Sequence, residues 1–113
     1  MNIIKQIRYF IQRGKRGYSD CDLWGFDCYL SSVISKGLRQ LSNQKESYPV
    51  FLKSVKQWGK ILNKIADGIE APNKSNEDID LPFEEWKSNL ENSYKKQQKA
   101  LKLFSKYFNN FWD

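Results

Sequence analysis

The residues best suited to chemistry lie together in one short stretch, from Arg16 to Leu30. The stretch reads RGYSDCDLWGFDCYL and combines one arginine, three aspartates, two cysteines and four aromatic residues. Clustered carboxylates can hold Mg²⁺ or Mn²⁺. A cysteine near a helix N-terminus can act as a nucleophile if its pKa is lowered. The stretch therefore raises two chemical hypotheses, a metal site and a thiol site.

The aspartates of this stretch have a simpler explanation than a metal site. Asp20 and Asp27 are seven residues apart and share a helical face, whereas Asp22 lies on another face. Asp20 and Asp22 also suit the first turn of a helix, where negative charge is favoured. Asp27 can instead pair with an arginine such as Arg16 or Arg39. We therefore expect no metal and no other cofactor.

The sequence contains no histidine. This excludes Ser-His-Asp and Cys-His catalytic sites and removes the commonest nitrogen ligand of zinc. Cys21 and Cys28 would lie about 10.5 Å apart on a helix, too far for a mutual disulfide, and we expect both thiols to be buried. The sequence also lacks a glycine-rich phosphate loop. We therefore expect the protein not to be an enzyme.

Helices must position these residues, because apolar residues recur every three or four positions along the chain. The helices are expected at residues 2–13, 20–42, 50–69 and 82–112. A polar acidic linker is expected at about 70–80, and a bend near 91–95 is an alternative to one long last helix. Ser19 should cap the second helix, with Asp22 completing a variant capping box. The sequence thus predicts an all-α, single-domain helical bundle of three or four helices over residues 1–113, with its core between the second, third and last helices.

The first predicted helix is amphipathic and basic. Its apolar residues are Ile3, Ile4, Ile7, Phe10 and Ile11, and its charged residues are all basic. Such a helix can lie on a membrane surface or a nucleic acid, or it can pack in the core with a solvated basic face. We favour packing in the core.

A net charge of +6 and a pI of about 9.3 attract polyanions to the protein. The parts needed to grip phosphate and stack a base are combined in Arg13, Lys15, Arg16 and Tyr18. A lysine stripe on the third helix includes Lys53, Lys56 and Lys60. Basic and acidic segments alternate along the chain, however, which favours pairing between segments over one continuous nucleic-acid-binding face.

A protein partner would require large rings at the surface. The chain has more large rings than a small core easily hides, among them Trp24, Tyr29, Tyr107, Phe108, Phe111 and Trp112. The alternative is that these rings form the core. The candidate binding residues are therefore Arg13, Lys15, Arg16, Tyr18, Asp20, Asp22, Trp24, Asp27, Lys53, Lys56, Lys60, Tyr107 and Trp112.

Three motifs together resemble a family of small phage and prophage accessory proteins. They are R-G-Y-S-D-x-D-L-W-x-x-D-x-Y-L from Arg16, W-x-x-I-L-x-K-I-A-x-G-I-E from Trp58 to Glu70, and the C-terminal L-x-L-F-x-K-Y-F-x-x-F-W-D. The resemblance implies a setting in the cytoplasm of an infected bacterium and supplies no catalytic residues. Small proteins of this kind often bind and block a host factor, which is an analogy rather than a property of the residues.

The family pattern further suggests that the first and last motifs are neighbours. Arg16 would pair with Asp20, Asp27 or Asp113, and Trp24 would stack against Trp112. Such a staple between the ends of the chain is a structural role that competes with a binding role.

The function expected from the sequence is non-catalytic binding of a host or anti-phage-defence macromolecule, with a protein as the favoured partner. One alternative is nucleic-acid binding through the basic N-terminal segment and the lysine stripe. Another is sequestration of a small anionic nucleotide. No apolar run approaches the ~20 residues of a membrane span and no secretory signal is recognisable, so we expect a cytoplasmic protein without a membrane partner.

Overall fold

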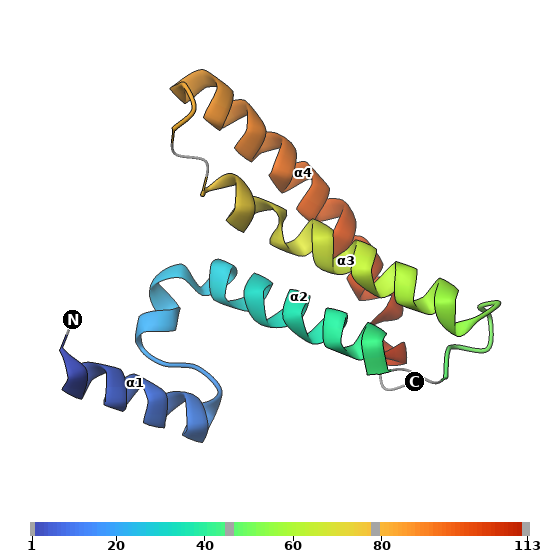
Figure 1. The fold of residues 1–113 in the computed structure, drawn as a ribbon, viewed down its shortest axis with the longest axis horizontal. Helices are drawn as coiled ribbons and strands as arrows, with labels where there is room; N and C mark the ends of the chain where they lie inside the picture. Colours follow the sequence, from blue (N-terminus) through green and yellow to red (C-terminus); the bar gives the residue numbers. More distant parts are fainter. Residues whose placement is uncertain (1, 45–46, 78–79, 112–113) are drawn as a thin grey trace. The chain divides into compact units, whose positions relative to one another are not determined.

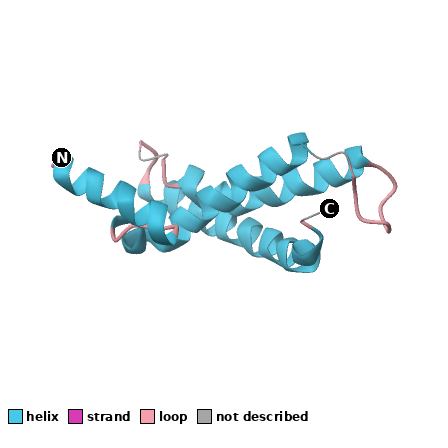
Figure 2. Ribbon diagram, turned by 90° about the horizontal axis from the view of Figure 1, so that it is seen from below, coloured by secondary structure: helices cyan, strands magenta, loops and turns pink. Residues whose placement is uncertain are grey.

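The computed structural model of the chain describes residues 2–44, 47–77 and 80–111. Within these residues every regular element is a helix, as Figure 2 shows. The elements are α1 (Ile3–Arg16), the 3-10 helix η1 (Cys21–Gly25), α2 (Phe26–Gln44), α3 (Val55–Ser75), α4 (Phe83–Tyr107) and the 3-10 helix η2 (Phe108–Asn110) (Figure 1). The predicted all-α class is confirmed.

The chain divides into two compact units, residues 1–30 and residues 31–113. Helix α2 begins in the first unit and continues into the second. That residues 1–113 form a single domain stays a prediction. None of the helices in the described part of the chain combines the length and the apolar character needed to cross a membrane.

Helix α1 is set by its two caps. The side chain of Asn2 accepts a hydrogen bond from the backbone N–H of Ile4 at 2.9 Å. At the other end Gly17 adopts a left-handed conformation (φ 85°), and its N–H donates to the carbonyl of Arg13. A positive φ favours glycine, because other residues pay a steric cost there. The expected end at residue 13 is wrong because Gly17, and not Gly14, makes this cap.

Helix α3 differs from its predicted range of 50–69 at both ends. Ser54 caps its start by accepting a hydrogen bond from the N–H of Gln57 at 3.1 Å. Its C-terminal part runs through Pro72 into the predicted linker, although proline removes a helical hydrogen bond. Pro72 is buried, and Gln97 of α4 donates to the Ile69 carbonyl at 2.8 Å. These tertiary contacts support the extension of α3 to Ser75, six residues beyond its predicted end at residue 69.

The second unit contains the hydrophobic core. Helices α3 and α4 run antiparallel, as Figure 1 shows, with Trp58 near the start of α3 against Tyr107 at the end of α4. Helix α4 is one continuous element from Phe83 to Tyr107, so the alternative of a break near 91–95 is wrong. The buried apolar residues are Leu38, Trp58, Leu62, Ile65, Ala66, Ile69, Ala100 and Tyr107. They come from α2, α3 and α4, which confirms the predicted composition of the core.

Polar contacts tie α2 to α3 beside this core. Arg39 of α2 forms ion pairs with Asp67 at 2.8 Å and with Glu70. These contacts raise the pKa of Arg39, with the hydrogen bond to Asp67 as the main cause. Ser42 donates to the Gly59 carbonyl at 3.3 Å and accepts from Asn63 at 3.1 Å. The amphipathic helices of the second unit are therefore joined by both apolar and polar contacts.

Candidate functional site

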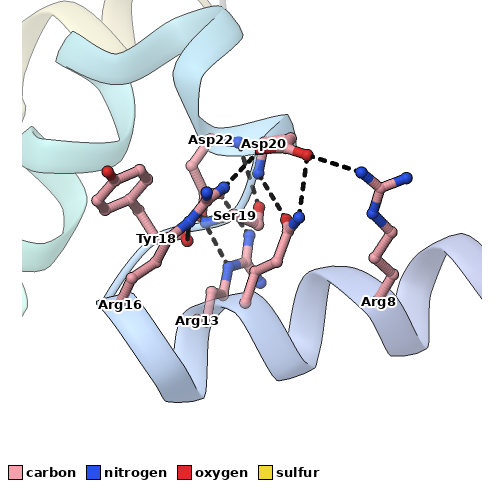
Figure 3. Close-up of polar contacts among 8 residues, drawn as sticks. Arg8, Arg13, Arg16, Tyr18, Ser19, Asp20 and Asp22 are labelled. Atoms are coloured by element: carbon pink, nitrogen blue, oxygen red, sulfur yellow. Dashed lines mark hydrogen bonds and ion pairs between the residues drawn. The ribbon is translucent and has the colours of Figure 1, made fainter.

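The motif that begins at Arg16 folds back onto α1 through a polar network, which we call the arginine clasp (Figure 3). The clasp consists of Arg8, Gln12, Arg13 and Arg16 of α1 and of Ser19, Asp20 and Asp22. The reversal of the chain at Gly17 makes this possible, because it returns residues 18–22 along the helix that precedes them.

Asp22 is the buried centre of the clasp, with 8% of its surface exposed. The N–H of Ser19 donates to its carboxylate at 2.8 Å, and the N–H of Asp22 donates to the Ser19 hydroxyl at 3.3 Å. The predicted capping box is therefore confirmed, although it opens the 3-10 helix η1. Arg13 adds two hydrogen bonds to the same carboxylate, at 2.9 and 2.5 Å. These bonds hold the pKa of Asp22 well below its ordinary range, with Arg13 as the main cause.

Asp20 is the second acceptor of the clasp. Its carboxylate accepts hydrogen bonds from Arg16 at 2.5 Å, from Gln12 at 2.9 Å and from Arg8 at 3.3 Å. The Gln12 side chain in turn accepts from the N–H of Asp20 at 2.8 Å. The hydrogen bond from Arg16, followed by that from Gln12, lowers the pKa of Asp20. Of the partners considered for Arg16, the structure shows Asp20.

Aromatic rings back the clasp. Tyr18 and Phe26 meet edge to face at 6.0 Å between ring centroids, and Phe26 stacks with Tyr29 at 6.3 Å. The Tyr29 hydroxyl donates to the Gly17 carbonyl at 2.6 Å. The Arg16 guanidinium lies over the Tyr18 ring, 4.6 Å from its centroid. Arg16 and Tyr18 are therefore occupied by contacts within the first unit.

The polar face of α1 carries the clasp, and its apolar face is left exposed. At 100° per residue, the clasp residues Gln12, Arg13 and Arg16 are centred roughly opposite the isoleucines, and Arg8 lies at the border between the two faces. The exposed fractions are 70% for Ile3, 72% for Ile4, 54% for Ile7, 77% for Phe10 and 48% for Ile11. None of the described side chains of α1 is buried. Within the first unit the clasp binds the polar face of α1 and leaves this apolar face uncovered, so its packing in the core stays a prediction.

A shallow groove runs along the exposed side of α1, which we call the α1 groove. Its apolar lining consists of Ile4, Ile7 and Ile11. Its polar lining consists of Arg8, Gln12, Lys15 and Arg16. Among the described residues no carboxylate lines it. The groove is therefore an apolar surface with a basic edge.

The other candidates from the first unit lie at the surface. Trp24 is 92% exposed, which makes it the most accessible ring of the motif. Asp27 is exposed. Cys21 and Cys28 are also exposed, so the expectation of buried thiols is wrong. The proposed stacking of Trp24 on Trp112, and the pairing of Arg16 with Asp113, fall outside the described residues.

The candidates from the second unit separate into surface and core. Lys53 precedes α3, and Lys56 and Lys60 lie on it; all three are exposed. Tyr107 is 8% exposed and packs against Trp58, with ring centroids 5.5 Å apart. Tyr107 is therefore a core residue and is not exposed as a binding surface.

Sequence reasoning missed a second basic surface, which we call the lysine groove. Its lysines are Lys64, Lys96, Lys99 and Lys102, and its floor consists of Gly68, Ala100 and Leu103. The lysine-rich composition of both helices is visible in the sequence. Their convergence was not, because it depends on the register in which α3 and α4 pack.

The fold and its two surfaces define a small all-α protein with an arginine clasp, the α1 groove and the lysine groove. In the described ranges no group of three or more His, Cys, Asp or Glu side chains is placed to hold a metal ion. No protein-family model matches the sequence, and no curated protein and no solved structure match it.

Proposed function

We propose that this is a non-catalytic binding protein that inserts the apolar face of α1 into an apolar groove of another protein. The observation that carries the proposal is the orientation of α1, whose polar face is fixed by the clasp while its isoleucines point outward. Exposed contiguous apolar surface on a small protein commonly marks an interaction site. The absence of histidine from the sequence supports a role without catalysis.

The spacing of the apolar residues suits a protein groove. Ile4, Ile7 and Ile11 follow the i, i+3, i+7 pattern by which an amphipathic helix fills such a groove. Phe10 adds an exposed aromatic ring beside them. The clasp fixes the helix before binding, which reduces the entropy lost on association.

The basic residues along the α1 groove indicate which charge the binding surface of the partner should carry. The basic residues Arg8, Lys15 and Arg16 line the α1 groove. Arg8 and Arg16 share the single carboxylate of Asp20, so their charge is only partly compensated. A second copy of this chain would bring equal charges together, whereas a partner with an acidic edge is complementary. The resemblance to phage and prophage accessory proteins adds that the partner is a host or anti-phage-defence protein.

A matched set of variants tests the proposal. The double variant Ile7→Ser with Phe10→Ser disrupts the apolar face of α1. The first control, Lys5→Ser, introduces serine at a position of α1 outside that face. The second control, Val50→Ser, removes an apolar side chain that is 99% exposed and lies outside α1. Tagged full-length chains are used to capture proteins from lysate of a bacterial host, with quantification by mass spectrometry. We expect one protein to be retained by the wild type and both controls and to fall more than ~10-fold with the double variant, as for loss of two anchor residues.

The purified partner should then bind the wild type directly in calorimetry and show the same dependence. The proposal fails if no captured protein depends on Ile7 and Phe10. It also fails if the double substitution abolishes binding to anionic vesicles, or converts a dimer to a monomer in sedimentation, because the occupant is then a membrane or a second copy. A lowered melting temperature of the double variant alone would show that the face packs inside the folded chain.

A further inference from the structure

We propose that the lysine groove between α3 and α4 binds the phosphate backbone of a nucleic acid. The proposal concerns the second unit and does not rest on the role of α1. It also uses α4 residues rather than the basic N-terminal segment, whose arginines are engaged in the clasp.

A close helix contact brings the lysines together. A Cβ atom placed on Gly68 would lie 2.4 Å from the Cβ of Ala100 and 3.2 Å from the carbonyl oxygen of Lys96. The glycine therefore allows α3 and α4 to approach at this point. Lys64 lies one turn before Gly68, and Lys96 lies one turn before Ala100. The contact thus draws the lysines of two helices to the edges of one groove.

The charge of the groove is not compensated within the described part of the chain. None of its four lysines forms an ion pair with a described carboxylate, and no carboxylate is among the residues that line it. The acid Asp67 lines a neighbouring hollow together with Lys96. Asp67 is bound to Arg39 at 2.8 Å. The groove therefore carries a concentrated positive charge that favours a polyanion.

The kind of polyanion follows from the lining. Lysine is a flexible point charge that binds phosphate without directional selectivity. Gly68, Ala100 and Leu103 form an apolar floor. Among the described residues, no aromatic ring lines the groove to offer a base a stacking surface. Contacts of this kind go to the backbone and do not read sequence.

The length of the basic surface favours a polymer over a mononucleotide. Exposed lysines continue from Lys96 to Lys106 on α4, which spans about 15 Å of helix. Lys60 extends the row on α3 by one turn. A nucleic-acid strand in a duplex presents a phosphate about every 3.4 Å along its axis, so several phosphates can be contacted at once.

Fluorescence anisotropy with a labelled 20-base-pair DNA duplex of arbitrary sequence tests the proposal, over a range of salt concentrations. Four lysine contacts predict a slope of log K against log salt of about −3 to −4. The quadruple variant Lys64→Gln, Lys96→Gln, Lys99→Gln, Lys102→Gln should weaken DNA binding ~10-fold or more. It should also remove most of the salt dependence, since each phosphate contact contributes about one unit to the slope of log K against log salt.

The matched control is Lys5→Gln, Lys36→Gln, Lys74→Gln, Lys87→Gln, which removes the same charge from exposed positions outside the lysine groove. It should retain most of the affinity and slope. An equal loss of DNA affinity in both variants would show that binding depends only on net charge and would overturn the proposal. The absence of DNA binding by the wild type at 20 mM salt would also overturn it. Equal or tighter binding of polyglutamate of the same charge would identify an acidic polypeptide instead. Single-stranded DNA and duplex RNA should behave like the DNA duplex within ~10-fold, because the site reads phosphate.

Discussion

Asp22 connects a local signal in the sequence to a longer-range contact in the structure. The capping box with Ser19 was predictable, because both residues lie within one helical turn and satisfy each other's backbone N–H groups. The pairing of Arg13 with the same carboxylate was not predictable from spacing, because it depends on the chain reversing at Gly17. Gly14 and Gly17 both follow the predicted end of the first helix, and the structure shows that Gly17 is the one that adopts the left-handed conformation.

The lowered pKa values of Asp20 and Asp22 predict an acid-sensitive clasp. A carboxylate whose pKa is lower in the folded than in the unfolded chain adds stability above its ordinary pKa of about 3.9. That stability is lost as the pH falls through the lower folded value. We expect the clasp to persist from pH 7 to about 5 and to open well below pH 4, followed by NMR through the Ser19 amide that donates to Asp22.

The variant Asp22→Asn is the control for this titration. It removes the charge that Arg13 contacts, so the clasp should be weaker at pH 7 and respond less to acid. If the Ser19 amide of the variant titrates with the same midpoint and amplitude as the wild type, Asp22 is not the group that opens the clasp.

Among the elements, α1 shows what hydrophobic periodicity does and does not determine. Its period predicted a helix and identified the apolar face. It did not predict the environment of that face, because the clasp attaches α1 by its opposite side. In α3, Pro72 indicated a helix end by its local chemistry, and burial together with the bond from Gln97 to Ile69 outweighed that preference.

The contact between α3 and α4 can be tested with two identical substitutions. Gly68→Ala places a methyl group 2.4 Å from the Cβ of Ala100 and should destabilise the protein by about 1–3 kcal/mol through overpacking. Gly37→Ala meets no atom within 4 Å on α2 and should stabilise it by about 0.5–1 kcal/mol. Urea unfolding followed by circular dichroism measures both. Changes of the same sign and size would show that α3 and α4 can separate at no cost.

At the scale of the whole molecule, the apolar core lies in residues 31–113, whereas residues 1–30 are held mainly by charged and aromatic contacts. The sequence predicted the helices that build the core, because their apolar residues are strongly periodic. It did not predict the lysine groove, which requires the relative register of two helices about 30 residues apart in the chain.

The two units should respond separately to mutation, as measured by amide hydrogen exchange. Asp22→Ala removes the centre of the clasp and should speed exchange in α1 and η1 while leaving residues 58–69 of α3 unchanged. Leu62→Ala truncates a fully buried side chain and should cost about 2–5 kcal/mol, with faster exchange in α3 and α4. If either variant accelerates exchange equally throughout the chain, the units unfold as one.

The clasp has a kinetic consequence that follows from its short range. Its longest contact joins residues 12 apart, whereas the bond from Gln97 to Ser31 joins residues 66 apart. Contacts between near neighbours form quickly, because little chain entropy is lost in closing short loops. A ribosome adds only about 5–20 residues per second and releases the N-terminus first. The clasp can therefore close on the nascent chain while α4, which completes the core, is still being synthesised.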